Sequence, residues 1–341
     1  MRRPTLSCRP PFWAKGAHLQ TLLGHFLPSP AADLPWERLN LKLADGDALR
    51  VLLARGTSDV VVHLFHGLGG SSDADYMQRA ATLCAMQGHT VMAINHRGSG
   101  EGRGLAAKPY HMGCTPDMAA MIQVGRGFFP EHLHAAVGFS LSATVLLLLL
   151  GRDAELPQPD LAIAVNPTFD LDLASRRLCQ GVNRMYDLRF VKLLRKHVQE
   201  RWELGLLEQP VDIPALATLR EFDELFTARA AGFRDRNHYY ASCDCRPHLR
   251  GVQVPTVLLT SKDDPFVPSA DLMDAELSPQ VHLHEEAKGG HMGYVGRGAP
   301  GFRWLDYALD HYLRELVAMA KSPGSTQAWT TSSVPEPVSG S

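Results

Sequence analysis

The chain has 341 residues, a formal net charge of −2 and 45% hydrophobic residues. This length and apolar content predict one large α/β domain with an insertion, or two small domains, and they exclude wholesale disorder. Lysines and arginines are scattered along the chain, so we expect neither a nucleic-acid surface nor a polybasic membrane patch.

No apolar segment follows the charged residues 1–10, which argues against a signal peptide. The longest apolar run, residues 135–150, contains glycine, serine and threonine and falls short of the ~20 residues that a transmembrane helix needs. We therefore expect a soluble, cytoplasmic protein with no integral membrane segment, which is a monomer or a weak homo-oligomer.

The six cysteines show no spacing typical of a disulfide framework. Cys243 and Cys245, with His238 and His248, could be regarded as a zinc cluster, but their spacing differs from the usual ligand patterns. We predict no metal and no cofactor.

Residues 1–35 are rich in proline and aromatic side chains, and we expect an ordered arm with a short helix around residues 18–26. The role of this arm does not follow from its residue types. The segments 39–43 and 48–54 flank an Asp-Gly turn, which predicts a β-hairpin.

Continuous apolar runs predict strands buried on both faces of a sheet. These runs are residues 60–65, 90–95, 135–139, 161–165, 256–260 and 281–285. Helical patterns lie between several of them, at 74–87 and 118–128, with Thr115 as the predicted N-cap of the second. This alternation predicts a mostly parallel sheet with helices on both faces, so the loops that follow the strands meet at one edge.

Residues 166–242 have a different pattern, with amphipathic helical stretches and no clear strand. We interpret them as a helical cap inserted over the edge of the sheet, where it would shape substrate access and exclude water. The predicted core is then residues 36–165 and 243–320, closed by a helix at 301–319. Residues 321–341 are rich in serine, threonine, proline and glycine, and we expect them to be disordered.

Ser140 lies where an apolar strand pattern changes to an apolar helix pattern, with Gly138 two residues before it and Ser142 two residues after it. This arrangement is similar to the G-x-S-x-G nucleophile elbow, which holds a serine on a strained turn between a strand and a helix. Serine replaces the second glycine here, and short G-x-S patterns also occur by chance, so the motif alone leaves an incidental serine as the alternative.

The remaining parts of a serine hydrolase occur in the chain order Ser, Asp, His that α/β hydrolases use. Asp264 follows a predicted strand, and His291 lies in a glycine-rich loop after the last strand. Each would be unremarkable alone, but together with Ser140 they predict a catalytic triad. Asp263 competes with Asp264, and we favour Asp264 because it lies one step further onto the loop.

The glycine-rich segment 66–70 follows the strand that should neighbour the elbow strand. We expect the backbone N–H groups of Leu68 and Leu141 to form the oxyanion hole. His66 could be mistaken for a catalytic base, but its position favours a role in shaping the loop. For residues 96–98, turn formation is preferred over anion binding.

As a set, these residues resemble the YheT-like branch of the α/β-hydrolase superfamily, which includes abhydrolase-domain lipases and fungal medium-chain ethyl ester synthase/esterases. The matching segments are His18-Leu19-Gln20-Thr21, His66-Gly67-Leu68-Gly69-Gly70, Asn95-His96-Arg97-Gly98, Gly138-Phe139-Ser140-Leu141-Ser142, Asp263-Asp264-Pro265-Phe266 and Gly290-His291-Met292-Gly293. Members usually carry glycine at the position of Ser142.

The resemblance implies an α/β-hydrolase fold with a mostly parallel central sheet, flanking helices and a helical cap insertion. It also implies a carboxylic-ester hydrolase with Ser140, Asp264 and His291 as its triad, but it does not fix the substrate. The apolar cap predicts a small hydrophobic ester with a short- to medium-chain acyl group. An acyltransferase that uses an alcohol acceptor would need the same triad, and a non-catalytic binding protein is a further alternative.

Overall fold

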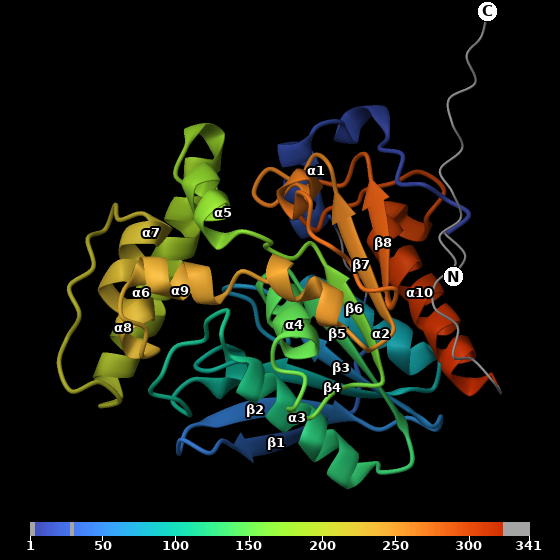
Figure 1. The fold of residues 1–341 in the computed structure, drawn as a ribbon, viewed down its shortest axis with the longest axis horizontal. Helices are drawn as coiled ribbons and strands as arrows, with labels where there is room; N and C mark the ends of the chain where they lie inside the picture. Colours follow the sequence, from blue (N-terminus) through green and yellow to red (C-terminus); the bar gives the residue numbers. More distant parts are fainter. Residues whose placement is uncertain (1–3, 28–30, 323–341) are drawn as a thin grey trace, which may run out of the picture.

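The computed structural model describes residues 4–27 and 31–322 and contains an eight-stranded sheet in the order β1-β2-β4-β3-β5-β6-β7-β8 (Figure 1). The strands are β1 (Glu37–Lys42), β2 (Ala48–Ala54), β3 (Val60–Phe65), β4 (Thr90–Asn95), β5 (Leu133–Phe139), β6 (Leu161–Val165), β7 (Thr256–Ser261) and β8 (Val281–Glu286). β2 is antiparallel to β1 and β4, and every pairing from β4 through β8 is parallel. The predicted mostly parallel sheet is confirmed.

The parallel register determines where a site can form. Phe65 at the end of β3 pairs with Gly138, and Phe139 at the end of β5 pairs with Val165 of β6. Val165 in turn pairs with Leu259 of β7. The carboxyl ends of these strands therefore lie side by side, and the loops that follow them leave from one edge, where parallel sheets bind their ligands.

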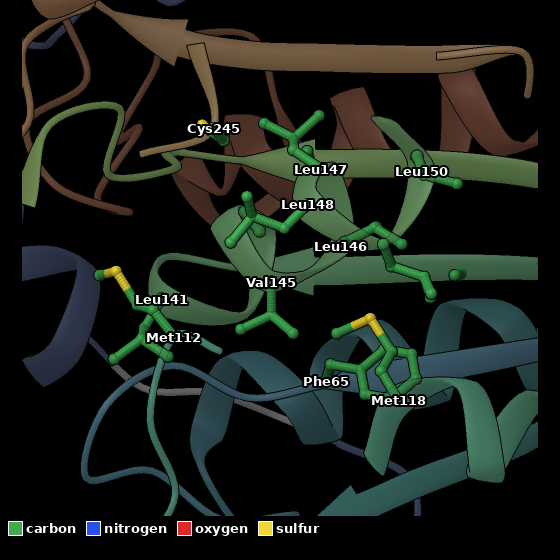
Figure 2. Packing of buried hydrophobic residues seen from close by; sticks show 14 of the residues in the cluster. Phe65, Met112, Met118, Leu141, Val145, Leu146, Leu147, Leu148, Leu150 and Cys245 are labelled. Carbon is green, nitrogen blue, oxygen red and sulfur yellow. The ribbon is translucent and has the colours of Figure 1, made fainter. Parts of the chain in front are cut away.

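Helices cover both faces of the sheet (Figure 1). α3 (Thr115–Phe128) and α4 (Leu141–Gly151) pack on one face, and α2 (Asp75–Met86) and α10 (Trp304–Lys321) pack on the other. Every residue from Leu141 to Leu150 is buried, which explains why α4 has no polar side in the sequence. Figure 2 shows Phe65 and Met118 in the same apolar cluster as the α4 side chains.

A second group of helices follows β6 and lies beside the sheet (Figure 1). They are α5 (Leu171–Leu178), α6 (Arg184–Glu203), α7 (Leu219–Phe222), α8 (Ala228–Ala230) and α9 (Arg236–Ser242). A separate apolar cluster packs α5, α6 and α7 together and includes Phe222, Phe226 and, from the loop after β7, Phe266, whereas the buried tyrosines of α9 belong to the cluster on the α4 face of the sheet. Residues 166–242 are all described and contain no strand. The division of the chain into a core and a cap stays a prediction.

The arm contains α1 (Ala17–Phe26), close to the range expected for its helix. In Figure 1, α1 lies near the carboxyl ends of β7 and β8, far from its neighbours in sequence β1 and β2. Among the helices of the described residues, none is both long enough and apolar enough to cross a membrane.

The starts of α3 and α10 and the end of α10 differ from expectation. Thr115 is the first residue of α3 instead of its N-cap, and its hydroxyl donates to the Asp153 carboxylate at 2.5 Å. α10 begins at Trp304 and continues to Lys321, so it reaches the first residue of the segment 321–341 that was expected to be disordered. Residues 323–341 lie outside the described part of the chain.

Candidate active site

Ser140 occupies the sharp turn between β5 and α4. Its φ of 54° and ψ of −118° form a strained combination for a residue with a side chain. The Ser140 N–H donates to the carbonyl oxygen of Val165 at 2.8 Å, which ties the turn to β6. Gly138 has no room for a side chain, since a Cβ there would lie 2.6 Å from the carbonyl oxygen of Ser142. The sharp turn therefore requires the glycine that precedes it.

Three side chains from separate elements form a continuous hydrogen-bonded relay. Ser140 Oγ lies 2.8 Å from Nε2 of His291, and His291 Nδ1 lies 2.8 Å from Oδ2 of Asp264. Ser140 follows β5, Asp264 follows β7, and His291 follows β8. The structure thus brings together the three residues that the sequence analysis selected, across 151 positions of the chain.

Asp264 is fully shielded from solvent, with 0% of its side chain exposed. Its Oδ1 accepts hydrogen bonds from the backbone N–H groups of Phe266 and Val267 at 2.9 and 3.0 Å, and its Oδ2 accepts one from Nδ2 of Asn166 at 2.8 Å. Burial alone would raise the pKa of this carboxyl, but His291 and the two backbone donors outweigh it and lower the pKa below its ordinary value. Asp264 is therefore held as a carboxylate.

Asp263, the competing acid, points elsewhere. Its Oδ1 accepts the backbone N–H groups of Gly289 and Gly290 at 2.8 and 3.0 Å. Asp263 therefore supports the main chain of the loop that carries His291, whereas Asp264 contacts the imidazole itself.

The segment 66–70 approaches Ser140 closely. A Cβ on Gly67 would lie 3.0 Å from Cβ of Ser140. Within residues 4–27 and 31–322, the amides of Leu68 and Leu141 donate to no other protein group. Both residues line the cavity that contains Ser140. Two unengaged N–H groups beside a serine hydroxyl are what an oxyanion site needs.

Ser142, at the position of the second glycine of the G-x-S-x-G motif, is completely buried and makes three hydrogen bonds. Its hydroxyl donates to the carbonyl oxygen of His66, and it accepts from the Tyr110 hydroxyl at 2.6 Å and from Nε2 of His96 at 2.9 Å. The Tyr110 and His96 rings stack with their centroids 3.7 Å apart. Ser142 therefore connects the elbow to the segment 66–70.

His66 is completely buried and does not line the cavity that contains Ser140. Its Nδ1–H donates to the carbonyl oxygen of Gly67 at 2.8 Å, and its Nε2 accepts from the backbone N–H of His96 at 3.2 Å. Burial lowers its pKa to about 4, so the imidazole is neutral. Both partners are backbone groups: one belongs to the segment 66–70 and the other to the loop after β4. The contacts therefore fit a role of His66 in shaping the segment 66–70.

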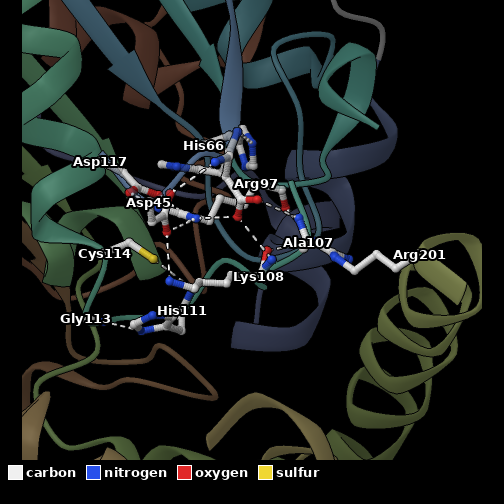
Figure 3. A network of polar contacts seen from close by, with 12 residues as sticks. Asp45, His66, Arg97, Ala107, Lys108, His111, Gly113, Cys114, Asp117 and Arg201 are labelled. Atoms are coloured by element: carbon white, nitrogen blue, oxygen red, sulfur yellow. Dashed lines mark hydrogen bonds and ion pairs between the residues drawn. The ribbon is translucent and has the colours of Figure 1, made fainter. Parts of the chain in front are cut away.

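Arg97 is held by carboxylates of the same chain (Figure 3). It makes a two-point contact with Asp117 at 2.7 Å and also donates to Asp45 and Asp47 at 2.9 and 2.6 Å. In the same view, Arg201 reaches from α6 to this loop and donates to the carbonyl oxygens of Arg97 and Lys108. Arg97 thus fixes the loop after β4, and its guanidinium is already occupied by anions of the protein.

A cavity of about 1020 Å³, including the part open to solvent, lies between the sheet edge and α5–α9. Ser140 and His291 line it together with mostly apolar side chains. The apolar lining includes Leu68, Leu141, Leu171, Leu178, Phe190, Leu194, Phe222, Phe226 and Phe266. Asp223 adds a polar group to the wall, and burial raises its pKa to about 6.

The four residues considered as a zinc cluster differ in their exposure to solvent. Cys243 and Cys245 are buried, whereas His238 is exposed. Over the described ranges, no group of three or more His, Cys, Asp or Glu side chains is arranged to hold a metal ion.

Sequence reasoning missed two contributors to the relay. Asn166 follows β6 directly and adopts a left-handed φ of 47°, and its place at the carboxyl end of a strand could have marked it. Thr21 on α1 accepts the backbone N–H of His291 at 2.9 Å. Thr21 belongs to the His-Leu-Gln-Thr segment, one of the segments on which the family resemblance is based. The contacts of this segment could not be predicted from its residue types.

The chain is similar to several known proteins. The putative esterase YheT of Escherichia coli strain K12 is 29% identical over 288 residues, which cover 82% of this chain and 84% of that protein. The medium-chain fatty acid ethyl ester synthase/esterase 2 of Saccharomyces cerevisiae is 25% identical, over 70% of this chain and 58% of that protein.

Among solved structures, an esterase from Pyrococcus furiosus superposes with a TM-score of 0.57 at 16% identity, over 86% of this chain and 96% of that one. This similarity shows the α/β-hydrolase fold. Residues 56–293, more than half of the chain, match the model of a family described as serine aminopeptidase, S33. The chain therefore belongs to this Hydrolase_4 family and is an esterase- or lipase-like α/β hydrolase.

Proposed function

We propose that the chain hydrolyses carboxylic esters through Ser140, His291 and Asp264. Ser140 is the nucleophile, His291 is the general base and then the general acid, and Asp264 orients His291. The observation that carries this proposal is the unbroken relay of two 2.8 Å contacts that begins at a strained serine. The relay opens onto a largely apolar cavity, which supports a hydrophobic ester as the substrate.

In the first half of the reaction, Ser140 Oγ attacks the ester carbonyl carbon while His291 Nε2 takes the hydroxyl proton. The carbonyl oxygen becomes negatively charged and receives hydrogen bonds from the amides of Leu68 and Leu141. The tetrahedral intermediate then collapses: the bond to the alcohol oxygen breaks, that oxygen takes the proton from His291, and an acyl ester remains on Ser140.

In the second half, a water molecule attacks the acyl carbon while His291 Nε2 removes one of its protons. Collapse of the second intermediate breaks the bond to Ser140 Oγ, which recovers a proton from His291, and the carboxylic acid leaves. Asp264 remains a carboxylate throughout and stabilises the imidazolium that forms in each half.

We propose that α5–α9 form the cap and that the acyl chain lies against their apolar side chains. Leu178, Phe190 and Leu194 belong to these helices and line the same cavity as Ser140. A cavity of this kind accepts a short- to medium-chain acyl group and keeps bulk water from the acyl-enzyme.

The direct test is labelling with a fluorophosphonate followed by mass spectrometry of the modified peptide. We expect modification of Ser140 in the wild-type protein and none in Ser140→Ala, because the probe reacts with an activated serine. A folded wild-type protein that remains unlabelled and cleaves no p-nitrophenyl ester would overturn the proposal and favour a non-catalytic binding protein. For an active protein, a panel of p-nitrophenyl esters of increasing chain length would measure the preferred length of the acyl group.

Acyl transfer to an alcohol is the second candidate, because it uses the same acyl-enzyme. The name of the yeast relative, an ethyl ester synthase/esterase, favours testing it. Product analysis with added ethanol separates the two: hydrolysis gives only the acid, whereas transfer gives an ethyl ester that rises with ethanol concentration.

A further inference from the structure

The loop that carries His291 has a backbone that requires support from outside. Within residues 289–295, Gly290, Met292 and Tyr294 have left-handed φ angles of 57°, 62° and 41°. Glycine adopts this region freely, but methionine and tyrosine do so at a cost. Met292 directly follows His291 and Tyr294 lies two residues further on, so contacts with the rest of the molecule must fix the loop.

α1 supplies these contacts from a distant part of the chain. The Thr21 hydroxyl accepts the backbone N–H of His291 at 2.9 Å, and it donates to the carbonyl oxygen of Ala17 at 2.9 Å. Gln20 is completely buried and binds both main-chain groups of Val295: Oε1 accepts its N–H at 2.7 Å and Nε2 donates to its carbonyl oxygen at 3.1 Å. α1 therefore fixes the loop at His291 and again four residues later.

The two backbones also lie in direct contact. A Cβ on Gly290 would be 2.5 Å from the carbonyl oxygen of Ala17, and one on Gly293 would be 2.2 Å from the carbonyl oxygen of Gln20. From the other side, a Cβ on Gly24 would be 2.5 Å from Cα of Gly293. Such distances exclude any side chain at these positions, so glycines on both segments allow α1 to approach the loop closely.

α1 is also connected to the acid loop and to the α5–α9 region. The His18 ring stacks on Tyr186 of α6, with centroids 5.8 Å apart. Tyr186 packs edge-on against Phe266 at 4.7 Å, and Phe266 lies 5.0 Å from the His291 ring. One turn of α1 thus contacts the loop of His291 through its backbone and approaches the imidazole through two aromatic rings.

We propose that α1 is the positioning element of His291, with Thr21 and Gln20 as its positioning residues. This inference rests on the proposed function of the Ser140–His291–Asp264 relay. Neither Gln20 nor Thr21 lines the cavity, so both act through the main chain of the loop instead of through the substrate. Their contribution is to keep His291 Nε2 within hydrogen-bonding distance of Ser140, since a shift of about 1 Å can cost about 100-fold in rate.

The experiment compares Thr21→Val, Thr21→Ser and Thr82→Val. Valine keeps the shape of Thr21 and removes the acceptor, whereas serine keeps the hydroxyl. Thr82 on α2 is the matched control, because its hydroxyl likewise donates to the carbonyl oxygen four residues earlier and accepts a backbone N–H from a distant segment, that of Ala32. Active sites are titrated with the fluorophosphonate, and kcat and KM are measured on a p-nitrophenyl ester.

We expect Thr21→Val to lower kcat per titrated site by about 10- to 100-fold with little change in KM. Thr21→Ser keeps the hydroxyl and should retain most of the wild-type kcat. Thr82→Val should keep kcat within about twofold, as a change remote from the site. Equal kcat values for Thr21→Val and Thr82→Val would overturn the inference.

Hydrogen exchange separates this inference from the proposed function. In Thr21→Val the amide of His291 loses its acceptor and should exchange faster, whereas Thr82→Val should leave it unchanged. If the wild-type enzyme proves inactive, the proposed function fails, and faster exchange at His291 still supports the positioning contact. Unchanged exchange at His291 in Thr21→Val overturns the contact whatever the activity.

Discussion

The two halves of the site are held in place by different means. The elbow half, Ser140 with the segment 66–70, is built on neighbouring strands β3 and β5 and on the buried helix α4. The histidine half, Asp264 with His291, depends on loops whose shape is fixed by side-chain hydrogen bonds from Asn166, Asp263 and α1.

This difference predicts how each half fails. Damage to the elbow disturbs the core and should appear first as lost stability, because the turn is packed between a strand and a helix. Damage to the histidine half should appear first as lost turnover, because its loops lie at the edge of the sheet.

The sharpest test of the histidine half compares the two adjacent aspartates. Asp264→Asn should lower kcat by about 10⁴-fold, the scale seen when the triad acid becomes an amide. Asp263→Asn should lower kcat by about tenfold, because an amide oxygen can still accept from Gly289 and Gly290. If Asp263→Asn abolishes turnover and Asp264→Asn does not, the acid is misassigned.

The elbow half is tested by Gly138→Ala. The new Cβ would lie 2.6 Å from the carbonyl oxygen of Ser142, so we expect a loss of about 3 kcal/mol in the free energy of unfolding, measured by urea denaturation. Gly127→Ala is the control: nothing lies within 4 Å of its added Cβ, and a helical alanine should stabilise by about 0.5–1 kcal/mol. Two variants of equal stability would contradict this account of the turn.

Ser142 couples the elbow to the segment 66–70, and its removal should have a smaller effect. Ser142→Ala leaves the hydroxyl of the half-buried Tyr110 and the ring nitrogen of the buried His96 without their partner, which should cost about 1–3 kcal/mol of stability. Ser142→Gly removes the same hydroxyl and should lose the same stability. It should lose a further ~0.5–1 kcal/mol, because glycine has more backbone freedom in the unfolded chain. A glycine variant with higher stability and higher turnover would mean that the hydroxyl network is dispensable.

The smallest expected effect is a dependence of stability on pH. The folded-state pKa of Asp264 lies below its ordinary value, so folding favours the ionised carboxyl. Its contribution is therefore present above the unfolded pKa of about 3.9 and is lost as the pH falls below it. Urea unfolding measured between about pH 2 and 5 should show a steeper loss of stability with falling pH in the wild type than in Asp264→Asn. Equal pH dependence in the two proteins would count against the depressed pKa.

Much of the elbow half could be predicted from the sequence, because its signals are local. Apolar runs such as 60–65 marked the buried strands, and the small residues around Ser140 marked the turn. The hydroxyl network of Ser142 was not predictable, because Tyr110 and His96 are brought to it only by the folded loop after β4.

The histidine half was predictable only in part. Asp264 and His291 could be selected because they follow strands in the order that the fold demands. The contact of Thr21 with His291 could not, since it joins residues 270 positions apart and leaves no periodic pattern.

The distance between α1 and its loop has a consequence during synthesis. Thr21 is made 270 residues before His291, which at about 5–20 residues per second is an interval of roughly 15–55 s. In that interval the strands and helices of the elbow half are already made, while α1 still lacks the backbone that it packs against. A ribosome-bound chain would then present an assembled serine turn that cannot react, and reactivity toward a fluorophosphonate would arise only after the last loop has emerged and docked.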